Sequence, residues 1–121
     1  MKYAALIYSD QTAWAELSPE EAERQRAASM PGWLAAFEEI AKADPEGNGR
    51  SRELEAASEA KVVRIRNGER LVTDGPFPGT KEQLGGLFVI DLPDLDEAIR
   101  IAALIPASEY GSVEIRPLVV R

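Results

Sequence analysis

The residues best suited to chemistry lie in one turn-rich segment, residues 72–86, which reads VTDGPFPGTKEQLGG. Asp74 stands where an apolar stretch gives way to Gly75 and Pro76. A carboxylate beside a cleft can work as a general acid or base when burial raises its pKa. The same position also suits a structural role, because Asp side chains commonly accept backbone N–H groups in turns. The sequence leaves both roles open for Asp74.

Cations and aromatic rings near this segment could complete a binding site. Lys81 follows Asp74 in the same segment and Arg64 precedes it, and such groups can hold an anionic ligand. Simple exposure to solvent is the alternative for Lys81, as it is for most lysines. Tyr8 at a strand end and Trp14 in the next loop are the candidates to line the mouth of a pocket. The other large aromatic residues are expected in the core.

The composition excludes several kinds of site. The 121 residues include no Cys and no His. We therefore expect no thiolate chemistry, no histidine-based nucleophile, no zinc site of the usual kind and no His-ligated haem. We predict no metal and no cofactor. The net charge is −7, which repels phosphate backbones, so direct binding to nucleic acid is not expected.

Length and hydropathy predict one domain, residues 1–121. A chain of this size holds one hydrophobic core. The apolar start at residues 1–8 is too short for a signal peptide, and no apolar run approaches the roughly 18 residues of a membrane span. We expect a cytoplasmic protein without a membrane partner.

Residue alternation and turn signals predict the strands. They fall at residues 2–8, 52–57, 61–66, 69–73, 87–91 and 112–118. Asn67-Gly68 is the pair that a type I′ hairpin turn requires. Thr80 and Gln83 form a capping pattern that predicts one short helical turn before residue 87. Arg116, a cation within an apolar strand, is expected either at a dimer interface or paired with a carboxylate.

Two helical regions complete the pattern. Ser18 and Glu21 form a capping box for a helix that starts at about residue 19 and stops before Asp44. Pro31 is expected to kink or break this helix, because it lacks a backbone donor. Asp94 caps the last helix, which Pro106 ends.

The element order is β-α-β, hairpin, β-α-β. This order predicts an α+β fold of the ferredoxin-like type, with an antiparallel sheet and both helices on one of its faces. Residues 61–66 place apolar side chains on both sides of their strand. A homodimer that packs sheet against sheet would bury the uncovered face.

The chain resembles the YCII-related (DGPF-domain) family of small bacterial proteins. The central similarity is Asp74-Gly75-Pro76-Phe77. Further similarity lies at residues 1–8, 14, 18–21, 91–98, 105–107 and 110–117. The resemblance implies a ferredoxin-like fold assembled as a dimeric α/β barrel.

Two departures from the family pattern limit which residue roles the resemblance implies for this chain. Pro78-Gly79 stand where members commonly have Ala-Glu, and residues 44–60 also differ from the usual pattern. A His-Asp pair has been suggested for the wider family. Since this chain has no His, only the Asp of that pair is present, at Asp74.

Two functional classes follow. In the first, a small molecule is bound or converted in a cleft beside Asp74 without metal or His, and it is anionic if Lys81 and Arg64 contact it. In the second, which the family resemblance suggests, the protein is a regulatory or interaction partner of a bacterial extracytoplasmic-function sigma factor. A purely structural module is a third alternative, and the sequence does not decide whether the chain is an enzyme.

Overall fold

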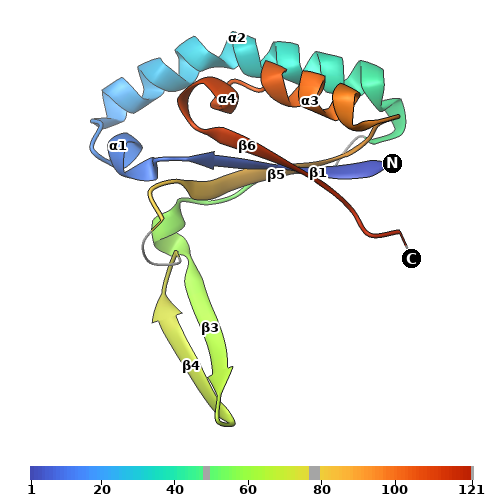
Figure 1. The fold of residues 1–121 in the computed structure, drawn as a ribbon. Coiled ribbons are helices and arrows are strands. Elements are labelled where there is room, and N and C mark those ends of the chain that lie inside the picture. The colour runs from blue at the N-terminus through green and yellow to red at the C-terminus, as the bar shows by residue number, and fades with distance from the viewer. Residues whose placement is uncertain (48–49, 77–79, 121) are drawn as a thin grey trace.

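An antiparallel four-stranded sheet forms the centre of the computed structural model, which describes residues 1–47, 50–76 and 80–120. Its strand order is β2–β5–β1–β6. The strands are β1 (Lys2–Ser9), β2 (Ser51–Glu53), β5 (Gln83–Asp91) and β6 (Ser112–Pro117). The helices α2 (Pro19–Ala43), α3 (Leu95–Leu104) and α4 (Ala107–Tyr110) all lie over one face of it (Figure 1). The chain is therefore an α+β protein with antiparallel sheets, as predicted.

The core lies between this sheet and the helices. Alternate residues of β1 and β5 face the helices, because successive side chains of a strand point to opposite faces. Buried Tyr3 pairs with buried Ile90, and buried Ala5 pairs with buried Phe88. Ile101 and Ile105 are the largest fully buried side chains. The intervening strand residues face away from the helices.

The helix α2 runs without interruption through Pro31, so the break expected as one of two outcomes is absent. Ser18 caps it as predicted, since the Ser18 hydroxyl accepts a hydrogen bond from Glu21 N. Pro31 removes the helical hydrogen bond to the carbonyl of Ala27. Both residues are exposed, so water can satisfy that carbonyl and the helix continues.

Three local elements differ from the prediction. The short helices α1 (Gln11–Ala15) and α4 were not expected. The helical turn expected from Thr80 is absent, and β5 begins at Gln83 instead of residue 87. Gln83 pairs with Ser9 of β1, and its side-chain carbonyl accepts a hydrogen bond from Gln11 N. Because these contacts come from distant residues, the local capping pattern did not reveal them.

The strands β3 (Lys61–Arg66) and β4 (Glu69–Asp74) form a separate two-stranded hairpin. Its turn has positive φ angles at Asn67 (52°) and Gly68 (75°), as the predicted type I′ turn requires. The hairpin projects away from the sheet on the side opposite the helices (Figure 1). Two 3₁₀ turns, Pro45–Gly47 and Ala57–Glu59, flank β2.

The base of the hairpin depends on close contact between Gly75 and Ala60. Gly75 N donates a hydrogen bond of 2.8 Å to Ala60 O. A Cβ atom on residue 75 would lie only 2.9 Å from the Ala60 Cβ and 3.2 Å from the Ala60 carbonyl carbon. Glycine at position 75 is therefore needed to let the two backbones approach.

We predict that Gly75→Ala lowers the free energy of unfolding by about 1–3 kcal/mol, the usual cost of overpacking. Urea denaturation measures the change. Combining it with Ala60→Gly should recover part of the loss, because the second substitution removes the nearest side-chain atom. A Gly75→Ala variant as stable as the wild type would contradict this account.

Candidate functional site

The sheet face turned away from the helices has an apolar centre. Ala4 and Leu6 of β1 alternate with the buried residues of that strand and pair with Val89 and Leu87 of β5. All four are half-buried within the chain. We call this surface, Ala4, Leu6, Leu87 and Val89, the open face.

A polar chain borders the open face on the side of β6. By register, Glu114 pairs with Leu6 and Arg116 with Ala4, so both side chains lie on the open face. Arg116 Nη2 forms an ion pair with Glu114 Oε2. The Tyr8 hydroxyl lies 3.5 Å from Glu114 Oε1, to which it donates a hydrogen bond. Tyr8, predicted to line a pocket mouth, therefore lies beside a carboxylate.

Sequence reasoning did not identify Glu114 as a site residue. A signal for it was available, because Glu114 and Arg116 alternate with the apolar Val113 and Ile115 in the last strand. Such alternation places the two charged residues on one face. The pairing of Arg116 with a carboxylate agrees with one of its two expected roles.

Asp74 lies at the end of β4 on the hairpin, and its carboxylate is paired with the Lys61 ammonium of β3. Its side chain is 87% exposed. The hydrogen bond from Lys61 and then the positive charge of Lys61 lower the pKa of Asp74. One of the two roles left open for Asp74 supposed a pKa raised by burial, whereas the pKa of Asp74 in this chain is lowered. The alternative turn contact involves Phe77, which lies outside the described residues, and a catalytic role for Asp74 stays a prediction.

The other predicted site residues belong to three different segments of the chain. Arg64 pairs opposite Leu71, and alternation along β3 puts it on the hairpin face opposite to that of Asp74. Lys81 is exposed in the segment before β5. Trp14 of α1 is stacked against the Arg26 guanidinium, whose carbon lies 5.6 Å from the ring centroid. Lys81 comes two residues before Gln83, which pairs with Ser9 next to Tyr8.

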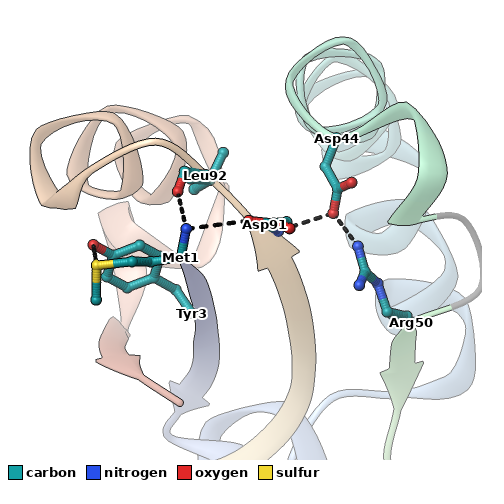
Figure 2. A network of polar contacts seen from close by, with 6 residues as sticks. All are labelled: Met1, Tyr3, Asp44, Arg50, Asp91 and Leu92. Atoms are coloured by element: carbon teal, nitrogen blue, oxygen red, sulfur yellow. Dashed lines mark hydrogen bonds and ion pairs between the residues drawn. The ribbon is translucent and has the colours of Figure 1, made fainter. Parts of the chain in front are cut away.

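A buried carboxylate joins three other parts of the chain (Figure 2). Asp44 ends α2 and is only 8% exposed. Its Oδ2 accepts a hydrogen bond of 2.9 Å from Asp91 N and forms an ion pair with Arg50 Nη2. The Asp91 carboxylate in turn lies 3.2 Å from the terminal ammonium of Met1, which also donates to Leu92 O at 2.8 Å. This network fixes the end of α2 against the ends of β5 and β1.

A pocket of about 450 Å³ lies next to this network. Phe37, Ile40, Phe88 and Ile90 give it apolar walls, while Asp44 and Arg50 provide its charged groups. The Asp44 carboxylate already binds its partners within the chain. We therefore interpret Asp44 and Arg50 as a structural joint.

The sequence contained one indication of the Asp44–Arg50 pair. Negative charge at the C-terminal end of a helix is unfavourable, so Asp44 at the end of α2 needs a compensating partner. Arg50, six residues later, supplies it.

We predict that Asp44→Asn lowers the free energy of unfolding by about 2–3 kcal/mol, because it leaves the partly buried Arg50 without its carboxylate. Thermal and urea denaturation measure the loss. Asp91→Asn is the matched control. Its carboxylate is 52% exposed, and its backbone N–H to Asp44 is kept, so it should cost less than about 1 kcal/mol. Equal losses in the two variants would contradict the assignment.

We also predict a pH dependence at the base of the hairpin. Because the folded-state pKa of Asp74 is lowered, the Lys61–Asp74 pair stabilises the hairpin above the pKa of this carboxyl in the unfolded chain. That contribution is lost as the pH falls through the folded-state pKa. Carboxyl NMR titration of the wild type should show the lowered pKa, and Lys61→Met should return it toward its ordinary value. An unchanged titration in Lys61→Met would show that the pair does not form.

Metal-ligating clusters and membrane-spanning helices are both absent from the described residues. These residues contain no group of three or more Asp, Glu, His or Cys residues that could hold a metal ion. None of the helices within them has the apolar length that crossing a bilayer requires.

The fold and the corner at Asp74-Gly75-Pro76 define a class of small α+β proteins with a one-sided sheet and a projecting hairpin. The chain belongs to the YCII-related domain family, whose family model matches residues 1–120. An uncharacterized protein of Rhizobium meliloti (strain 1021) is 36% identical to it over 120 residues. That alignment covers 98% of this chain and 92% of the relative. The family resemblance seen in the sequence is thus confirmed.

Proposed function

We propose that the sheet and its helices form a ferredoxin-like fold into which the β3–β4 hairpin is inserted. The strand order β2–β5–β1–β6 supports this, because both helical connections, α2 after β1 and α3 after β5, skip one strand position. Both connections also run over the same face of the sheet (Figure 1). The hairpin lies between β2 and β5 in the sequence and outside the main sheet.

The same sheet supports a homodimer that packs one open face against another as a dimeric α/β barrel. The apolar face of a sheet must be buried against another element. The helices of this chain pack on the face opposite to the open face, so the open face is left for a second copy. Leu6 and Leu87, which pair across β1 and β5, lie at the centre of the open face. A two-fold axis places the same patch of both copies in contact.

The function supported best is the binding of a small molecule between the two copies, beside Tyr8. The observation that carries the proposal is the polar chain of Tyr8, Glu114 and Arg116 at the border of the open face. It offers a hydroxyl, a carboxylate and a guanidinium, which can orient a ligand and exchange protons without metal or His. An anionic ligand would gain from Arg116 and from the Arg64 and Lys81 cations, which a second copy can bring near.

Sedimentation velocity of the wild type tests the dimer. We expect a dimer at micromolar concentration, and a shift to monomer in Leu87→Asp, because the substitution buries a charge at the centre of the contact. Leu34→Asp is the matched control. Leu34 lies on α2 and is exposed, so this variant should remain dimeric. A monomeric wild type would overturn the proposed assembly.

A thermal-shift screen with small carboxylates and phosphates tests the binding site. A ligand that raises the melting temperature of the wild type should have a weaker effect on Tyr8→Phe, which keeps the ring and removes the hydroxyl. The Asp74→Asn variant shows whether the hairpin carboxylate contributes to the same site. A ligand that stabilises Tyr8→Phe and the wild type equally would place binding elsewhere.

A further inference from the structure

One face of the β3–β4 hairpin presents branched aliphatic side chains to solvent. Val63 pairs with Val72, and Ile65 follows two residues after Val63 on the same face. Their exposed fractions are 59% for Val63, 59% for Ile65 and 55% for Val72. We call these three residues the hairpin patch.

Such a hairpin is poorly stabilised by its own chain. An isolated two-stranded hairpin is marginally stable at best in water, and it gains stability when an apolar face is packed against another element. Within the described residues, neither hairpin strand pairs with a strand of the main sheet, and the hairpin projects well away from that sheet (Figure 1). Its stability therefore depends on what covers the hairpin patch.

The position of the hairpin indicates that a second copy of this chain packs on the hairpin patch. The hairpin stands on the same side of the sheet as the open face (Figure 1). Six residues of strand span about 20 Å, whereas packed sheets lie about 10 Å apart. A copy docked on the open face would therefore lie alongside the hairpin, and the hairpin would extend past the sheet of that copy.

The distribution of charge favours the same occupant. Residues 61–74 carry four basic and two acidic residues, a net charge of +2, whereas the whole chain carries −7. The remaining residues therefore carry −9. Arg66 and Arg70 lie next to the hairpin turn, the part that reaches furthest from its own sheet. Because the rest of a second copy carries net negative charge, it attracts this positively charged end.

We infer that the β3–β4 hairpin is a dimerisation arm whose hairpin patch packs against the partner subunit. The inference rests on the proposed dimer of open faces and adds a second contact surface to it. In this arrangement each copy stabilises the hairpin of the other. The arm also brings Asp74 and Lys61 at its base to the edge of the space between the two sheets.

Two aspartate substitutions at neighbouring residues of β4 test the arm. Val72→Asp places a charge in the hairpin patch, and Thr73→Asp places one on the opposite face of the same strand. Both positions are exposed in one chain, so both variants should fold, which circular dichroism checks. We expect Val72→Asp to weaken dimerisation roughly tenfold or more, about 1.4 kcal/mol by conversion, and Thr73→Asp to change it much less.

The outcomes separate the arm from the dimer itself. A monomeric wild type overturns both proposals. A dimeric wild type that Leu87→Asp dissociates and Val72→Asp does not would keep the dimer of open faces and overturn the arm. Equal weakening by Val72→Asp and Thr73→Asp would also overturn it, because the effect would then not belong to the hairpin patch.

Amide hydrogen exchange of the wild type gives a second measurement that needs no substitution. If the partner stabilises the hairpin, the amides of residues 61–74 should exchange more slowly as the protein concentration rises through the dissociation constant. The amides of α3 serve as the internal control, because this helix packs on the core of its own chain. Hairpin exchange that does not depend on concentration would contradict the arm.

Discussion

The helices of this chain cover only one face of its sheet, and most other features follow from that constraint. Both helical connections run over the face that carries Tyr3, Ala5 and Phe88, so the core is a single apolar layer between sheet and helices. The opposite face keeps an apolar centre with a polar border at Tyr8 and Glu114. Function is therefore best sought where the chain leaves its own sheet uncovered.

Two local joints hold the parts of the molecule in place around this sheet. At one end, the Asp44 carboxylate connects the end of α2 to Arg50 and to the end of β5. At the start of the hairpin, Gly75 and Ala60 bring two backbones into direct contact. The glycine of the Asp74-Gly75-Pro76 corner thus has a packing role that is independent of any catalytic role for Asp74.

Much of the fold could be predicted from local signals. Alternation along the strands, the caps at Ser18 and Asp94 and the turn at Asn67-Gly68 depend on neighbouring residues, and the structure confirms them. The differences at Pro31 and Gln83 arose where distant or solvent contacts outweighed a local preference. The site was less predictable, because the exposure of Asp74 and the burial of Asp44 are set by the folded chain. The position of Asp44 at a helix end was the one part of this that the sequence indicated.

The place of β1 in the sheet has a consequence for synthesis on the ribosome. This apolar strand precedes both of its sheet neighbours in the chain, because β5 and β6 come from residues 83–91 and 112–117. The strand therefore has no sheet partner until most of the chain has been translated. Protein synthesis adds about 5–20 residues per second, so β1 waits for several seconds with unpaired backbone groups. During that interval the strand exposes apolar side chains and an unpaired edge, the features that make a nascent chain prone to aggregate.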